Sequence, residues 1–239
     1  MDLASSLAAI AFAALIHASF QLSVSVLSLL SGHAIGARHS HAKLTRLMSG
    51  FIFGTAVMTL LLLSFACLIL LQVFGPTMPP LMWIIGCGLL LGIGVAVWLF
   101  YYRKDRGTTL WIPRNVASYL TERTKKTRRS AEAFGLGLSS VFGELLFIVA
   151  PLVVSAMIII TLPAFWQLVS LGLYTIISMS SSLIVASLVG GGHKLSTIQR
   201  WREKNKYFLQ FTAGSGLIIL AFYLYVHQVT ALVAMGGTL

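Results

Sequence analysis

Charged residues are scarce in this chain of 239 residues: they make up 10% of it, and only 6 residues are Asp or Glu. A soluble domain of this length needs far more charge to cover its surface, so a soluble globular protein is excluded. Hydrophobic residues make up 57% of the chain, and its mean hydropathy is +0.90. The composition therefore predicts one all-α integral membrane domain over residues 1–239, without a separate soluble domain.

Motifs that carry known chemistry are also few. The sequence shows no nucleophile–base pairing, no spacing typical of metal ligands and no phosphate-binding loop. We therefore expect neither an enzyme nor a bound metal or cofactor. His39 and His41 lie beside basic residues, and we expect them to be solvated rather than to bind a metal.

Cysteine is limited to Cys67 and Cys87, which lie in consecutive apolar segments. Counted along ideal helices, both lie roughly 11–12 Å from the outer ends of these segments. Helices joined by a short turn are usually adjacent, so the two thiols would form a redox pair or a disulfide. The alternative is that each is a small buried apolar residue, as free cysteine usually is.

Six apolar segments are long enough to cross a bilayer. Between consecutive segments, the first, third and fifth connections hold all 17 Lys and Arg residues, and the two opposite connections carry no charge. The positive-inside rule then places both termini outside and the three basic loops in the cytoplasm of a bacterial cell, with the chain in its inner membrane. The expected spans are Leu3–Leu30, Leu47–Phe74, Pro80–Tyr102, Ala133–Ile160, Phe165–Val189 and Tyr207–Met235.

The longest basic loop covers residues 103–131. Trp111, Val116 and Tyr119 recur in it at roughly helical spacing, which predicts a short amphipathic helix in the membrane interface, followed by a basic run near anionic lipid. A solvated connector that only sets topology is the alternative. A net charge of +11 would indicate nucleic-acid binding in a soluble protein, but here the charges lie in membrane loops, so no nucleic-acid partner is expected.

The fourth apolar segment is the one that we expect the other five to surround. It carries a single acid, Glu144, and a single proline, Pro151, at which a helix break is predicted. A carboxyl in the bilayer interior is costly and indicates a functional site. By residue count, His17 of the first segment lies at the same depth, so a midplane site for a small solute or ion is predicted, with a His–Glu pair that relays protons or binds a cation. The further polar residues expected there are Ser19, Gln21, Ser23 and Ser140. The alternative is that Glu144 only ties helices together through a hydrogen bond.

Two similarities link the halves of the chain. Residues 86–91 in the third segment resemble residues 214–219 in the sixth, and at nearly the same offset His17 corresponds to Glu144. Two halves of three helices each would form an inverted repeat, although chance similarity between apolar helices is the alternative.

The hydroxyl run of residues 178–182 in the fifth segment would bond to its own helix or line a polar pathway.

The lead-in to the last segment is charged, "RWREKNKYFLQFTAGSGLIILAFYLY", and each half has a glycine-rich third helix. With six helices arranged three plus three, the chain resembles the lysine-exporter (LysE) superfamily, which includes the DsbD/CcdA thiol electron carriers and exporters of amino acids and metal ions. The stretch "FGLGLSSVFGELLFIVAPLVV" resembles the fourth helix of the CcdA type. The resemblance implies a membrane exporter. The reactive cysteines that the CcdA type carries in its first and fourth helices are absent here.

Three hypotheses follow from the sequence. The first, which we favour, is a LysE-like transporter of a small solute or ion with a site around Glu144. The second is a thiol electron carrier that uses Cys67 and Cys87. The third is a non-transporting membrane subunit whose basic cytoplasmic face docks a protein partner; a homo-oligomer would be compatible with any of the three.

Overall fold

The structure, a computed structural model, describes residues 1–20, 41–100, 114–127, 129–193 and 195–230. Within these ranges every regular element is a helix. The elements are α1 (Leu3–Ser19), α3 (His41–Phe74), α4 (Pro80–Phe100), α5 (Arg114–Lys126), α6 (Ser130–Ile159), α7 (Ala164–Ser178), α8 (Ser180–Gly190), α9 (Leu195–Lys204), α10 (Lys206–Leu224) and the π-helical η1 (Tyr225–Thr230).

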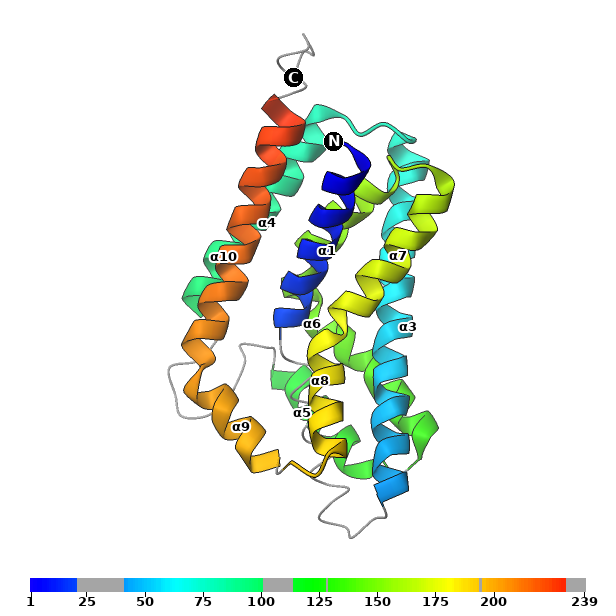
Figure 1. Ribbon diagram of the computed structural model, residues 1–239, viewed down its shortest axis with the longest axis vertical. Coiled ribbons are helices and arrows are strands. Elements are labelled where there is room, and N and C mark those ends of the chain that lie inside the picture. Colours follow the sequence, from blue (N-terminus) through cyan, green and yellow to red (C-terminus); the bar gives the residue numbers. More distant parts are fainter. Residues whose placement is uncertain (21–40, 101–113, 128, 194, 231–239) are drawn as a thin grey trace.

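The long helices form an elongated bundle and alternate in direction (Figure 1). α1 begins at the same end of the bundle at which α3, α6 and η1 finish. The opposite end holds the starts of α3 and α6 together with α5 and α9. The basic segments of the described chain therefore gather at one end of the molecule, away from the first residues of α1.

Four helices are long and apolar enough to cross a membrane: Lys43–Phe74, Pro80–Phe100, Ser130–Ile159 and Lys206–Thr230. α7 and α8 make a fifth span if they count as one helix bent by 47°. The expectation of an all-helical membrane protein is confirmed. The expected sixth span is only partly described, because α1 ends after 17 residues and the rest of the segment lies outside the described ranges.

α6 is the central helix. In its most apolar window 67% of the residues are buried, against 17% in α3 and 33% in α4. It packs against α1, α3, α4, α5 and α7, as expected for a helix surrounded by the others. α10 is the exception, since it packs on α4 and α1 instead.

Glycines allow the closest helix crossings. At Gly54 of α3, an added Cβ would run into the carbonyl of Phe134 in α6, and at Gly50 it would lie 2.8 Å from the carbonyl oxygen of Ser130. α4 and α10 also meet at glycines, and a Cβ on Gly94 would lie 3.1 Å from the carbonyl oxygen of Gly214. Small residues bring helix backbones together in this way where lipid supplies no hydrophobic drive for association.

The expectation that the second and third apolar segments are neighbours is wrong. α3 packs mainly on α6, and α4 packs mainly on α10 and also on α6, whereas α3 and α4 share hardly any contacts. The connection of residues 75–79 crosses the end of the bundle between them (Figure 1). A short turn fixes where the next helix starts but not which helix it packs on.

The predicted break at Pro151 is also wrong, since α6 continues through this buried proline to Ile159. A membrane helix tolerates proline because its neighbours and local adjustments support the backbone group that is freed. The bend lies instead in the next span, between α7 and α8 at Met179.

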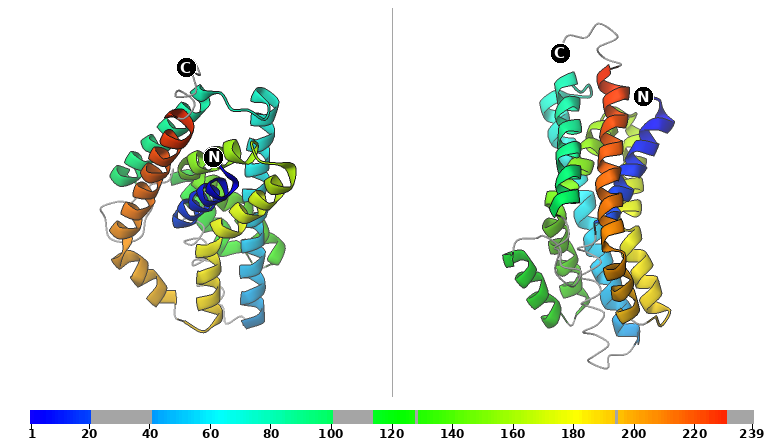
Figure 2. Two further views of the ribbon diagram at one scale, coloured as in Figure 1. Left: turned by 45° about the horizontal axis from the view of Figure 1, so that its top comes forward. Right: turned by 90° about the vertical axis from the view of Figure 1, so that its left-hand side faces the viewer.

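Two short helices lie at the basic end. α5 confirms that the long loop contains a helix, although Trp111 of the predicted pattern lies outside the described residues. Figure 2 shows α5 beside the lower part of the bundle rather than within it. α9 was not expected, because the sequence between the fifth and sixth segments was interpreted as a plain basic loop.

Candidate functional site

α1 ends in the interior of the bundle and positions His17 in its last turn. Asp2 caps the start of the helix by accepting the Ser5 N–H, and the Phe20 N–H closes the other end on the His17 carbonyl. The last carbonyls of a helix have no partner of their own. Here the Ser181 hydroxyl of α8 donates to the Ala18 carbonyl at 2.5 Å, so the end of α1 is bound to the start of α8.

His17 lies between a phenol and a carboxyl that come from two other helices. Its Nδ1 is 3.2 Å from the hydroxyl of Tyr174 in α7, and its Nε2 is 3.9 Å from Oε2 of Glu144 in α6. All three side chains are buried. The first distance is that of a hydrogen bond, and the second is that of an ion pair when His17 is protonated.

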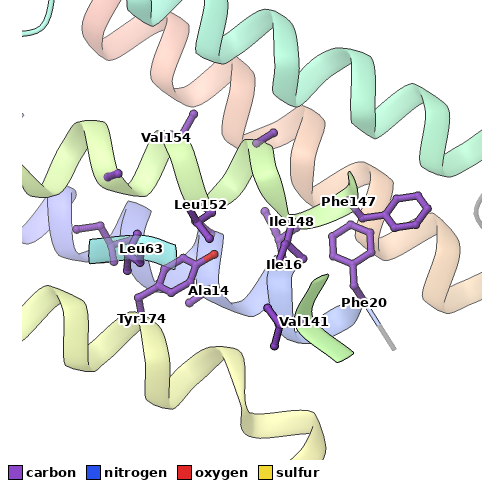
Figure 3. Packing of buried hydrophobic residues seen from close by; sticks show 14 of the residues in the cluster. Ala14, Ile16, Phe20, Leu63, Val141, Phe147, Ile148, Leu152, Val154 and Tyr174 are labelled. Carbon is purple, nitrogen blue, oxygen red and sulfur yellow. The ribbon is translucent and has the colours of Figure 1, made fainter. Parts of the chain in front are cut away.

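The cluster is embedded in apolar side chains. Figure 3 shows the Tyr174 ring among Ala14, Leu63 and Leu152, and shows Phe20 and Phe147 side by side on the other flank. The rings of Phe20 and Phe147 are stacked with centroids 5.6 Å apart. A buried polar group is costly unless it has partners. The apolar surroundings therefore favour contacts of the imidazole with the phenol and the carboxyl.

A small cavity lies beside the cluster. Its volume is about 20 Å³, which is room for roughly one water molecule. Its lining combines the His17 and Glu144 side chains with hydroxyl groups from α3 and from the bend between α7 and α8. The residues that contribute these hydroxyls are Thr55, Thr59, Ser178, Ser181 and Ser182. The site therefore has acceptors and donors for one water molecule or one small ion.

The bend at Met179 has a local cause. Thr175 and Ser178 donate their hydroxyls to the carbonyls of Leu171 and Thr175 in the preceding turn. Side-chain bonds of this kind compete with the backbone ladder and often bend helices. The bend lies beside the cavity, since Met179 lines the cavity together with Ser181 and Ser182, which follow the bend.

The structure brings some of the predicted site residues together and separates others. His17 and Glu144 meet, as expected. Ser19 donates to the Ile16 carbonyl at 2.6 Å and Ser140 to the Gly137 carbonyl at 2.8 Å, and neither residue lines the cavity. Gln21 and Ser23 lie outside the described residues.

Tyr174, Thr55 and Thr59 were missed as members of the site, whereas the serines of the hydroxyl run had a polar pathway as one of their two interpretations. Tyr174 had a readable signal, because a phenol in the middle of an apolar span needs a partner for its hydroxyl. The two threonines are four residues apart and so share one face of α3. Their hydroxyls point to a polar neighbour only once the packing of α3 on α6 is known.

The two cysteines do not form a disulfide. Both thiols are free; Cys87 is buried in α4, and the Cys67 sulfur lies 4.0 Å from the Ala156 carbonyl of α6. Their expected adjacency depended on α3 and α4 being neighbours, whereas each of these helices packs on α6. Among the described residues, no three His, Cys, Asp or Glu side chains are grouped in a way that could hold a metal ion.

Comparison with known proteins adds no relative to this description. No family model matches the chain, and no curated protein or solved structure matches it either.

Proposed function

We propose that this chain is a membrane transporter of a small solute or ion, with Glu144 and His17 at its binding site. The observation that carries the proposal is the buried contact of Glu144, His17 and Tyr174 beside a hydroxyl-lined cavity in the bundle. Ionisable groups in the membrane interior are rare and mark ion or proton pathways by default. A carboxyl favours a cation or a proton as the transported or coupled species.

The packing supports a LysE-like arrangement of two inverted halves. α1 packs on α7, and its counterpart α6 packs on α3; α1 also packs on α10, as α6 does on α4. Exchanging α1 with α6, α3 with α7 and α4 with α10 thus preserves these main helix pairs, although the contact of α6 with α7 has no counterpart of similar size between α1 and α3. In such a repeat the first segment would continue through residues 20–30 as a sixth span, and both termini would lie outside.

His17 lies where it would hold a proton against Glu144, with Tyr174 orienting its ring. When Tyr174 donates to Nδ1, the proton of the neutral imidazole resides on Nε2 and faces Glu144. Protonation of His17 places a cation opposite the carboxylate, and a bound cation would compete for the same carboxylate. Binding of the cation and release of the proton would therefore be coupled at Glu144.

The cavity limits what this conformation could bind. A site with room for roughly one water admits a proton, a water molecule or a bare ion. A larger solute would enter only after α8 moved relative to α7 about the bend at Met179, which is where the bonding of the helix is already interrupted.

Proton flux into proteoliposomes tests the proposal. Vesicles that contain the purified protein and the pH dye pyranine are given a membrane potential with K⁺ and valinomycin, with and without Na⁺ or Mn²⁺ outside. We expect a protein-dependent pH change that Glu144→Gln reduces at least tenfold, while the matched variant Glu122→Gln on exposed α5 leaves it unchanged. Equal flux in the two variants would contradict a role of Glu144.

One observation favours a second candidate, a non-transporting membrane subunit. The cavity is small and the cluster is enclosed by apolar packing, as expected when a carboxyl only ties helices together. This candidate predicts no proton flux above that of empty vesicles, with or without Na⁺ or Mn²⁺. It also predicts that Glu144→Gln lowers thermal stability and that another chain purifies with the basic end.

A further inference from the structure

A second cavity lies at the basic end of the bundle, in the angle between α5 and the start of α6. Its volume is about 370 Å³, much larger than that of the cavity beside Glu144. Two cationic side chains of α5, Arg123 and Lys126, line it together with the Tyr119 ring and hydroxyl-bearing side chains. From α6 it is lined by Glu132, Gly135, Leu136 and Ser139.

α5 is held firmly enough to present these two cations. Leu120 and Thr124 bury one face of the helix at 3% and 2% exposure, and α5 packs on α6. The Arg123 guanidinium lies over the Tyr119 ring, 5.4 Å from its centroid. This cation–π contact limits the positions of the guanidinium without using its N–H donors, and Arg123 itself lines the cavity.

The one carboxylate on the α6 side is engaged locally. Oε2 of Glu132 accepts the backbone N–H of Arg129 at 3.1 Å as part of the capping box that starts α6. A carboxylate in that position balances the positive end of the helix dipole. The lining thus carries the two cations Arg123 and Lys126 against the single carboxylate of Glu132, so positive charge remains in excess and favours an anion.

The floor of the cavity continues into an apolar stripe along α6. Gly135, Ser139, Phe142 and Leu146 follow one another at intervals of four, three and four residues, so they lie on one face of the helix. Nothing lies within 4 Å of a Cβ added at Gly135, and Phe142 and Leu146 are each 58% exposed. A ligand held at the cavity would have a lipid-facing surface directly below it.

We propose that this cavity binds the phosphate headgroup of an anionic phospholipid, with Arg123 and Lys126 on the phosphate and an acyl chain along Phe142 and Leu146. The site is independent of the transport proposed above, because it shares no residue with the cavity beside Glu144. The stripe is what selects a lipid over a free phosphate. A soluble anion would interact with the two cations, but it has no acyl chain to bury against the stripe.

Native mass spectrometry of the detergent-purified protein tests the site with phosphatidylglycerol, phosphatidylcholine and soluble glycerol phosphate as probes. We expect one phosphatidylglycerol to bind more tightly than either other probe. We also expect Arg123→Gln with Lys126→Gln to weaken its binding roughly 30-fold, since each basic residue near an anionic lipid contributes a factor of about five. The matched control, Lys125→Gln with Lys204→Gln, removes the same charge outside the cavity and should retain the lipid.

A third variant keeps every charge. Gly135→Leu fills the cavity from the α6 side, where an added side chain meets no neighbour, and should weaken phosphatidylglycerol binding without unfolding the protein. Equal loss of lipid in the control pair, equal binding of glycerol phosphate, or full retention in Gly135→Leu would each overturn the proposal. Elution of every variant as a monodisperse peak at the wild-type volume shows that the comparison is made on folded protein.

Discussion

The two nitrogens of His17 have separate partners. Nδ1 bonds the Tyr174 hydroxyl and Nε2 faces the Glu144 carboxyl, so a phenol that donates to Nδ1 leaves the proton of the neutral ring on Nε2. The orientation of this imidazole therefore depends on Tyr174, a residue 157 positions away in the chain.

Tyr174→Phe removes that control while it keeps the ring in its pocket. We expect a loss of about 1 kcal/mol in the free energy of unfolding, which is the usual range for one polar contact between membrane helices. Denaturant titration in mixed micelles measures it. Tyr225→Phe, at an exposed position, serves as the control and should change stability by much less. Equal stability of the two variants would show that the hydrogen bond to His17 contributes nothing.

Asp2 gives a pH dependence outside the membrane spans. The Ser5 side chain first, and its backbone N–H second, hold the pKa of the Asp2 carboxyl below its ordinary value of 3.8. The folded-state pKa thus lies below the unfolded one, so the stabilisation is complete above pH 3.8 and is lost as the pH falls through the folded value. We expect protection of the Ser5 amide from hydrogen exchange to fall over that range. In Asp2→Asn, which caps without a charge, this pH dependence should disappear; its persistence would assign the effect to another group.

Among the helices, the close crossing of α3 and α6 depends on glycines, which have no side chain to separate the two backbones. Gly54→Ala would place a methyl group against the Phe134 carbonyl, and backbone cannot move aside as a flexible side chain can. We expect a loss of about 1–3 kcal/mol, the usual cost of overpacking, seen as a lower melting temperature in detergent. Gly88→Ala in α4 meets no atom within 4 Å and should be neutral or slightly stabilising. Similar melting temperatures for the two variants would argue against the close approach at Gly54.

The contact between the end of α1 and the start of α8 gives another prediction at this scale. Ser181→Ala leaves the Ala18 carbonyl without its partner, and we expect about 1 kcal/mol of destabilisation. Ser178→Ala is matched to it, since that hydroxyl bonds only within its own helix, at the Thr175 carbonyl. If thermal unfolding ranks Ser178→Ala as the more harmful change, α8 is not held to α1 through Ser181.

The elements also show which features can be read from a sequence. The bounds of α4 and α6 agree with the apolar runs within a few residues, because an uninterrupted apolar run in lipid has no alternative to the helix. The contact between Tyr174 and His17 could not be predicted from the sequence in the same way. A membrane helix that is apolar on every side has no pattern to show which face packs on which neighbour, so the adjacency of α3 to α6 rather than to α4 was not predicted.

The bend at Met179 was missed for a related reason. The hydroxyl run of residues 178–182 was noticed, but serine bonds to its own helix in straight and bent helices alike. Pro151 gave the opposite error, since proline breaks helices in water far more reliably than it does between packed membrane helices. Neither the hydroxyl run nor the proline alone therefore predicts where this bundle bends.

For the whole molecule, the distribution of charge predicts the orientation in the membrane. In a background without Cys67 and Cys87, Thr77→Cys and Gln199→Cys place single exposed thiols at opposite ends of the bundle. The positive-inside rule predicts that a membrane-impermeant maleimide labels the first in intact spheroplasts and the second only after lysis. The reverse pattern would place the basic end outside, and with it the lipid cavity.

The neighbours of α3 and α4 have a consequence for synthesis of the chain. α3 packs mainly on α6, and α4 mainly on α10, and both partners are translated later than the helices they hold. Until α6 and α10 have been made and inserted, α3 and α4 lack the helices on which they will mainly pack. The helix faces that carry Gly54 and Gly94 would be exposed to lipid until the second half of the chain is inserted. The two halves of the chain are therefore interleaved in the bundle. A chain stopped after α4 would contain helices whose main partners are missing, and α3 and α4 would have to stay apart until those partners are inserted.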